Sequence, residues 1–201
     1  MFATTTLHPT LSSHLLPGNS ALRTGGLALG FSLFIALMAQ VAIPLPFTPV
    51  PLTGQTLAVL LVGIVLGPRL GLATVVLYLL QGVAGLPVFA GGKAGAAVLA
   101  GPTGGYLLAF PLAAALMGAL AQRGWDRNAL TMALGMVAGL AVIFALGLVW
   151  LGVWLGMAGK FGGVDALLGM GLWPFLPGEA LKAALVMALL PTAWKLTGRK
   201  G

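Results

Sequence analysis

A charged pair in the last apolar stretch of the sequence is the clearest candidate for chemistry. Glu179 is the only carboxylate within an apolar run, and Lys182 follows it three residues later in PFLPGEALKAAL. On a helix, this spacing places both side chains on one face. Charges at membrane depth are costly even when they are paired, so a pocket that uses them is the expected reason for their presence. The alternative is a self-satisfied pair near the interface, with Lys182 reaching outward to water.

The chemistry of this pair indicates the kind of ligand it would bind. An ionised carboxylate only accepts hydrogen bonds, so Glu179 suits a ligand with neutral N–H donors, such as a cyclic urea or an amide. Lys182 would then bond the carbonyl or carboxylate of the ligand. Lys93, in an apolar, glycine-rich stretch, is a second candidate for attracting an anionic group, although a solvated loop lysine is an equally good interpretation.

Further polar and aromatic side chains lie near the same ends of the predicted helices. Gln55 offers both donors and an acceptor, but a polar helix cap explains it equally well. Thr103 and Tyr106, in GPTGGY, could line a pocket. Phe89 and Trp173 could supply flat apolar walls to a ring-shaped ligand. For Tyr106 and Trp173 the alternative is an interfacial position at the edge of a membrane.

The elements that position these residues are predicted to be membrane helices. The 201 residues are 59% hydrophobic and 6% charged, whereas a soluble domain has about 25% charged residues. We therefore expect an all-α integral membrane protein with six transmembrane helices in a single bundle. The second and third are shorter than the roughly 20 residues that a span needs, so one could be a partial span packed inside the bundle. The apolar runs fall at about 25–41, 52–66, 70–86, 106–121, 129–157 and 178–194.

The distribution of basic residues predicts the orientation. With the N-terminus in the cytoplasm, seven bases face inward and two face outward, which satisfies the positive-inside rule. Residues 1–20 are then a cytoplasmic tail, residues 21–201 form the six-helix substrate-binding domain, and both chain ends are cytoplasmic. The inward bases are Arg23, Arg69, Arg123, Arg127, Lys195, Arg199 and Lys200, and the outward ones are Lys93 and Lys160.

Three connections on the predicted outer side have an unusual composition. Residues 87–105 and 158–177 are rich in glycine yet mostly apolar, and PLPFTPVPLT before Gln55 carries four prolines. Irregular backbone at membrane depth persists where it is buried in protein or lines a cavity. We expect these connections to fold back and to converge on one face as the walls of a pocket.

The first predicted helix has two stripes of small residues. Ala28, Ser32 and Ala36 recur at four-residue intervals, and Gly26 and Gly30 form a GxxxG pattern beside them. Such stripes permit close approach of another helix. That partner helix could belong to this chain or to another subunit.

Several functions are disfavoured by what the sequence contains. The sequence has no cysteine and only two histidines, which argues against a metal site, and its bases are scattered rather than gathered in the stripe typical of nucleic-acid binding. Gly92-Lys93 is followed by Ala94, so no P-loop is formed, and hydrolase motifs such as GxSxG and HExxH are missing. Binding or transport is favoured over catalysis. A proton- or ion-coupled carrier in which Glu179 titrates, and a membrane enzyme or assembly subunit, remain as alternatives.

Three of these stretches together resemble one known family. GLPVFAGG (85–92), GPTGGYLLAFPLAA (101–114) and PFLPGEALKAAL (174–185) are similar to the BioY family, the biotin-binding S components of energy-coupling factor (ECF) transporters. The resemblance implies a six-helix protein of the bacterial cytoplasmic membrane that captures biotin from outside and has no cofactor of its own. It also implies a transmembrane coupling subunit and two ATPase subunits, which hydrolyse the ATP.

The resemblance also assigns the charged pair. In that family an acid, commonly Asp, is followed three residues later by lysine, which corresponds here to Glu179 and Lys182. The extra methylene of Glu moves the carboxylate by roughly 1 Å. Biotin carries its cyclic urea and its carboxylate roughly 10 Å apart, whereas side chains at i and i+3 start about 5–6 Å apart. We therefore expect Glu179 to accept from the urea N–H groups, Lys182 to make a second polar contact, and Lys93 to lie nearer the carboxylate.

Overall fold

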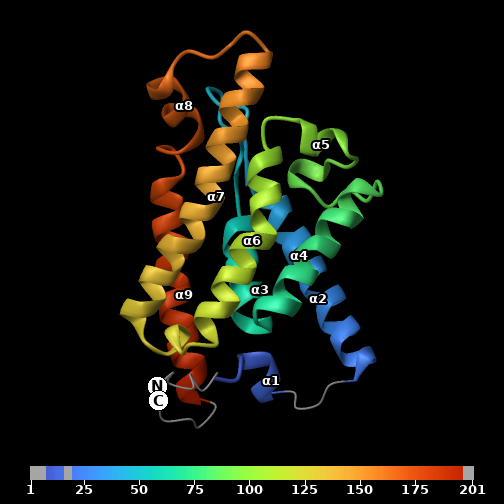
Figure 1. The fold of residues 1–201 in the computed structure, drawn as a ribbon, viewed down its shortest axis with the longest axis vertical. Coiled ribbons are helices and arrows are strands. Elements are labelled where there is room, and N and C mark those ends of the chain that lie inside the picture. Colours follow the sequence, from blue (N-terminus) through green and yellow to red (C-terminus); the bar gives the residue numbers. More distant parts are fainter. Residues whose placement is uncertain (1–7, 16–19, 197–201) are drawn as a thin grey trace, which may run out of the picture.

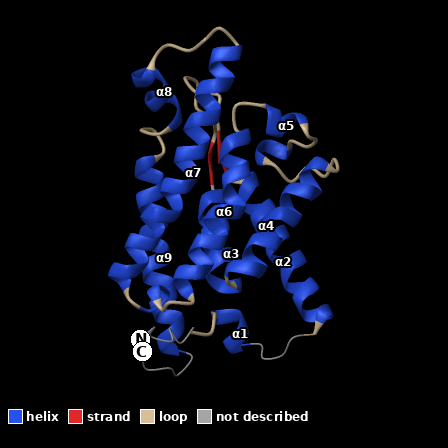
Figure 2. Ribbon diagram, viewed as in Figure 1, coloured by secondary structure: helices blue, strands red, loops and turns tan. Residues whose placement is uncertain are grey.

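The computed structural model describes residues 8–15 and 20–196, and these residues form a bundle of helices (Figure 1). Helix accounts for most of the described chain (Figure 2), as the sequence predicts. The long helices are α2 (Ala21–Gln40), α3 (Gln55–Leu66), α4 (Pro68–Val83), α6 (Gly104–Ala121), α7 (Ala129–Met157) and α9 (Leu176–Leu196). Shorter elements are α1 (Leu11–Leu15), α5 (Ala97–Ala100), α8 (Val164–Gly171) and the 3-10 turns η1 (Ala90–Gly92) and η2 (Trp125–Arg127).

The six predicted runs each form one long helix, but the start predicted for the second one is wrong. Leu52 and Thr53 form strand β2 (Leu52–Thr53), which pairs antiparallel with β1 (Ala42–Ile43). Helix α3 therefore begins three residues later than expected, at Gln55. The proline-rich residues 44–51 connect the two strands.

The helices differ in their ability to cross a membrane. By length and composition, α2, α6 and α7 are long and apolar enough to do so. Helix α3 has only 12 residues, or about 18 Å of helix, against a hydrocarbon core of about 30 Å. Eight of these residues are buried, so α3 corresponds to the short segment inside the bundle that the sequence allowed.

Glycines bring the helices close together. A Cβ at Gly63 of α3 would lie 2.2 Å from the carbonyl oxygen of Ala114 in α6. A Cβ at Gly105 of α6 would lie 2.2 Å from the Cβ of Trp150 in α7. Both distances are far below van der Waals contact, so these crossings require glycine, and α6 lies at the centre of the packing.

The bundle has two distinct ends (Figure 1). Helix α1, the junction of α3 with α4 and the turn η2 lie at one, here called the α1 end. The hairpin, α5 and α8 lie at the other, the α8 end. The arginines placed inside by the positive-inside rule, Arg23, Arg69, Arg123 and Arg127, belong to elements of the α1 end, whereas Lys93 and Lys160 belong to the α8 end. Arg199 and Lys200 lie outside the described residues.

Part of the expected N-terminal tail packs on the α1 end. Thr10 and Ser12 are buried, the backbone N–H of His8 donates to the carbonyl of Gln122 at 2.8 Å, and Arg23 donates to the carbonyl of Ser12 at 2.9 Å. Residues 8–15 are therefore part of the folded bundle. The rest of the expected tail, residues 1–7 and 16–19, lies outside the described residues.

Candidate functional site

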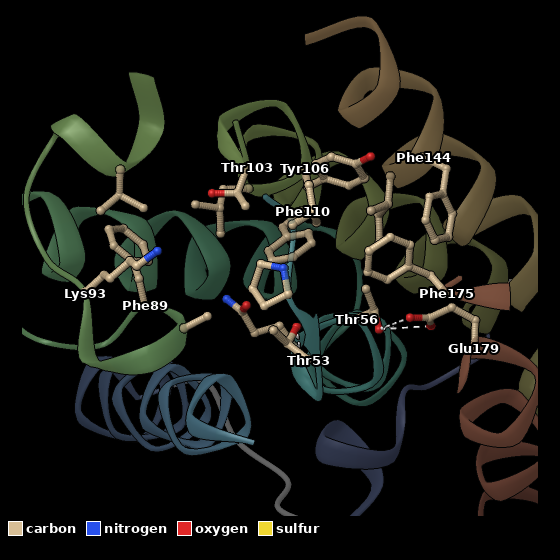
Figure 3. Close-up of a pocket in the computed structure, with 17 residues that line it drawn as sticks. Thr53, Thr56, Phe89, Lys93, Thr103, Tyr106, Phe110, Phe144, Phe175 and Glu179 are labelled. Carbon is tan, nitrogen blue, oxygen red and sulfur yellow. Dashed lines mark hydrogen bonds between the residues drawn. The ribbon is translucent and has the colours of Figure 1, made fainter. Parts of the chain in front are cut away.

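A pocket opens at the α8 end between the three connections that the sequence predicts to face outward (Figure 3). All three predicted connections contribute walls, so their expected convergence is confirmed. Helices α3, α6, α7 and α9 supply the rest. The lining residues are Val50, Pro51, Thr53, Gln55, Thr56, Phe89, Ala90, Lys93, Val98, Thr103, Tyr106, Leu107, Phe110, Ile143, Phe144, Phe175 and Glu179.

Glu179 reaches the pocket from the first turns of α9, where it is 4% exposed. The hydroxyl of Thr56 lies 2.8 and 2.9 Å from its two carboxylate oxygens, and Lys182 lies 2.8 Å from Oε1. A carboxylate has about four lone-pair directions. These two donors leave acceptor capacity on Glu179 for a ligand N–H.

Lys182 is turned away from solvent and toward the start of α3. Its ammonium group donates to Glu179 and also to the backbone carbonyl of Thr53 and the hydroxyl of Thr56, at 2.5 and 2.9 Å. An ammonium group has three N–H donors, so all three have a partner. Lys182 is a counter-ion and a brace for Glu179, and it does not line the pocket.

Gln55 presents an acceptor to the pocket. Its Nε2 donates to the hydroxyl of Tyr78 at 2.7 Å, and that hydroxyl donates to the carbonyl of Val88 at 3.0 Å. Tyr78 has one proton and uses it on Val88, so its oxygen must accept from Gln55, which fixes the orientation of the amide. The Oε1 of Gln55 has no hydrogen bond within the described part of the chain and remains available as an acceptor.

Lys93 closes the other side of the pocket from a tight turn. The backbone N–H of Phe89 donates to the carbonyl of Lys93 at 3.1 Å. The ring of Phe89 is 1% exposed and meets the ring of Tyr78 edge-on, with centroids 5.7 Å apart. Lys93 itself is exposed. Figure 3 shows Lys93 and Glu179 at opposite ends of the pocket, with Phe110 and Thr53 between them.

Aromatic rings form the wall between these two charges. Tyr106 donates its hydroxyl proton to the carbonyl of Gly171 at 2.9 Å and meets Phe144 edge-on, with ring centroids 6.1 Å apart. The ring of Phe144 also packs on the ring of Phe175, with centroids 6.2 Å apart. Edge-on ring pairs are favourable, and each of these side chains is held by a neighbour. The pocket thus has an acidic end, an apolar aromatic middle and a basic mouth.

A family model described as the BioY family matches residues 12–199 of the sequence. This chain belongs to the BioY family. The probable biotin transporter BioY of Pyrococcus horikoshii is 38% identical over 159 residues, covering 79% of this chain and 90% of that protein. The biotin transporter BioY of Rhizobium etli is 35% identical over 173 residues, covering 83% and 89%.

A solved structure has the same fold. A crystal structure of the S-component for biotin from an ECF-type ABC transporter superposes with a TM-score of 0.73 and 25% identity, covering 92% of this chain and 97% of that chain. Membership of the BioY family, together with the apolar helices, identifies a multi-pass membrane protein.

The pocket of this BioY-family chain brings together most of the residues singled out from the sequence. Gln55, Phe89, Lys93, Thr103, Tyr106 and Glu179 all line it. Lys182 stands behind Glu179, so the expected second polar contact has no free donor in this structure. Trp173 does not line the pocket and is 57% exposed. Phe175, 5% exposed, is the aromatic wall of that connection instead.

The small-residue stripes on α2 separate into a buried and an open part. Ser32 and Ala36 are buried within this chain, and Ala28 is half-buried. A Cβ at Gly26 or Gly30 would meet no atom of the described chain within 4 Å. The GxxxG stripe is therefore open on the outside of the bundle.

Sequence reasoning missed Thr56, Phe110, Phe144 and Phe175. Thr56 adjoins Gln55 at the start of α3. The N–H groups of a buried lysine such as Lys182 need oxygen acceptors, so a hydroxyl at a neighbouring helix end was the signal that could have identified Thr56. Phe110 follows Tyr106 by one helical turn, which places both on one face. Phe144 lies in the middle of the uniformly apolar α7 and gives no signal that sequence alone could provide.

Proposed function

We propose that this chain is the biotin-binding S component of an ECF transporter and captures biotin from outside for uptake. The observation that carries the proposal is the pocket with Glu179 at one end, Lys93 at the other and aromatic rings between them. Biotin has the complementary order of groups: a cyclic urea with N–H donors, an apolar thioether ring and a carboxylate tail. The role is binding and transport rather than catalysis.

The proposed pose sets the urea against Glu179 and the carboxylate near Lys93. The two ends of biotin are roughly 10 Å apart, which suits groups at opposite ends of one pocket. A urea has two N–H groups, and Gln55 Oε1 supplies a second acceptor beside Glu179. Phe110, Phe144 and Phe175 then cover the ring system. Lys182 acts through Glu179, because it pairs with the carboxylate and fixes its orientation.

The proposed topology places the pocket mouth outside the cytoplasmic membrane. All six long helices belong to the membrane domain, and the arginines of the α1 end face the cytoplasm together with both chain ends. The short α3 is continued toward the pocket mouth by the β1–β2 hairpin, in which Val50 is buried and Leu52 and Thr53 are half-buried.

The proposed partners are a transmembrane coupling subunit and two ATPase subunits, which hydrolyse the ATP. Support comes from the solved relative, which is described as the S-component of an ECF-type ABC transporter. The open stripe of Gly26 and Gly30 on α2 is the proposed contact face, since small residues allow a foreign helix to approach closely. The ion-coupled carrier is not favoured, because the relatives are biotin transporters and Glu179 already has a counter-ion.

Equilibrium titration of biotin into the purified protein in lipid nanodiscs tests the proposal. We expect saturable binding, and a loss of roughly 10- to 100-fold in affinity for Glu179→Gln, because a charged acceptor is replaced by a neutral one. Asp165→Asn is the matched control, since Asp165 is an exposed carboxylate of α8 outside the pocket. A wild-type protein that shows no biotin binding at micromolar concentration refutes the proposed function.

A further inference from the structure

Gln40, the last residue of α2, lies outside the pocket lining but makes hydrogen bonds to the turn that precedes Lys93. Its side chain is exposed, yet both ends of its amide are engaged. Oε1 accepts from the backbone N–H of Gly92 at 3.0 Å, and Nε2 donates to the carbonyl of Phe89 at 3.3 Å and of Ala36 at 3.1 Å. A side-chain amide that pairs with both an N–H and a carbonyl imitates a strand partner.

The backbone groups that bond to Gln40 belong to the turn just before Lys93. Gly91 and Gly92 have φ angles of 69° and 70°, a left-handed conformation that glycine adopts readily and other residues rarely do. These two residues reverse the chain so that Phe89 and Lys93 pair. The position of Lys93 at the pocket therefore depends on the single 3-10 turn η1 that precedes it.

The inner side of this turn is fixed separately. Tyr78 of α4 holds the carbonyl of Val88, and the Phe89 ring lies so close to Gly82 that a Cβ there would come within 2.1 Å of it. On the outer side, the hydrogen bonds that join α2 to the turn in the described chain all come from Gln40. Phe89 thus has support from α4, and beyond Lys93 the backbone N–H of Gly95 donates to the carbonyl of Gly82 in α4 at 2.8 Å. Gln40 supplies the hydrogen bonds from α2 to the turn between these two anchors.

We propose that Gln40 is a positioning residue that holds Lys93 where it meets the carboxylate of the ligand. The proposal rests on the proposed function and deepens it, because it assigns a support to the basic end of the pocket. A lysine side chain is long and flexible, so the placement of its backbone decides how often the ammonium group reaches the ligand. Without the Gln40 amide, the turn loses its grip on α2 while the acidic end around Glu179 keeps all of its contacts.

The test compares two ligands, biotin and its neutral carboxamide, biotin amide. With Gln40→Ala in nanodiscs, we expect the affinity for biotin to fall about three- to tenfold, as for the loss of one or two hydrogen bonds. The affinity for biotin amide should stay within about twofold, because Lys93 has no anion to meet. Adding Gln40→Ala to Lys93→Ala should cost little further affinity for biotin. Gln122→Ala, the same substitution at the α1 end, is the matched control.

The ligand comparison separates positioning from a general structural effect. Unchanged binding of biotin amide also shows that the variant is folded. Equal losses for both ligands, or no loss for biotin, overturn the role of Gln40. Full additivity with Lys93→Ala overturns it as well. A wild-type protein that binds neither ligand overturns the proposed function itself, and the assignment of Gln40 with it.

Discussion

Two buried carboxylates lie near opposite ends of α9 and differ in what surrounds them. Glu179 and Asp126 are 4% and 1% exposed, so burial alone does not tell them apart. The carboxylate of Glu179 accepts hydrogen bonds from Lys182 and Thr56 and faces the pocket. Asp126, in η2, receives the indole N–H of Trp194 at 2.7 Å on Oδ2, and its Oδ1 has no partner among the described residues.

The difference separates a ligand site from a structural tie. Around Asp126, the guanidinium of Arg127 lies 4.8 Å from the centre of the Trp194 ring, and the His14 ring lies 5.7 Å from it. These contacts join η2, the end of α9 and α1, and Asp126 does not line the pocket. Burial raises the pKa of Asp126 above its usual value, although the hydrogen bond from Trp194 and the positive charge of Arg127 act in the opposite direction. A buried carboxylate of a ligand site is thus distinguished from a structural one by the groups that contact it and by whether it lines a cavity.

Lys182→Met should give the largest effect on stability. It removes the counter-ion of a buried carboxylate, which typically costs about 3–5 kcal/mol of unfolding free energy. Arg127→Met is the matched change at the other carboxylate, and it should cost about 1 kcal/mol, since it removes the cation from the face of the Trp194 ring. Unfolding of both variants in nanodiscs, followed by tryptophan fluorescence, measures the difference.

A double variant separates pairing from ligand binding. Glu179→Gln combined with Lys182→Met removes both charges, and it should recover most of the lost stability because a missing pair is tolerated better than a broken one. Biotin binding should remain weak. Equal losses for Lys182→Met and Arg127→Met would show that the two carboxylates are alike, and strong biotin binding by the double variant would remove Glu179 from the site.

Adding one methyl group tests the packing beside the pocket and beside η2. Gly82→Ala sets a Cβ 2.1 Å from the Phe89 ring, so it should destabilise the protein by about 1–3 kcal/mol and disturb the pocket wall. Gly135→Ala, near η2, sets a Cβ 3.5 Å from Leu120, which is ordinary contact, and alanine favours helix by about 0.5–1 kcal/mol. Thermal unfolding and biotin titration of the two variants should differ in both respects. A silent Gly82→Ala would show that Phe89 is free to move.

Much of the site could be predicted from types and spacing. A carboxylate and a lysine three residues apart in an apolar run are rare enough to stand out, and the glycine-rich apolar connections indicated backbone that folds back. The helices followed from runs of apolar residues whose bounds lie within four positions of the observed ones, and the run 129–157 matches α7 at both ends. Helix α3 began late because Leu52 and Thr53 pair with Ala42 and Ile43, a contact between residues about ten positions apart that apolar runs do not reveal.

The remaining features depend on tertiary contacts. Asp126 stands in a connection and looks like a solvated loop residue, yet Trp194, 68 positions away, covers it. Trp173 and Phe175 are two residues apart and both aromatic, and only the turn between α8 and α9 decides which of them enters the pocket. The three donors of Lys182 could not be counted as satisfied before the carbonyl of Thr53 was placed beside them.

The smallest effect we expect concerns the pH dependence of Asp126→Asn. In the folded protein the pKa of Asp126 is raised above 3.8, chiefly by burial, so the folded state binds this proton more tightly than the unfolded state does. Stability from this group is therefore full below pH 3.8, falls as pH rises to the raised pKa, and is constant above it. Asparagine does not titrate, so the variant should lack this fall while it keeps biotin affinity within about twofold. Unfolding measured from below pH 3.8 to neutral compares the two proteins, and the other titrating groups cancel in the difference. If the unfolding free energies of the two proteins vary identically with pH, Asp126 is solvated. Glu179 and Asp126 would then differ only in that Glu179 lines the pocket.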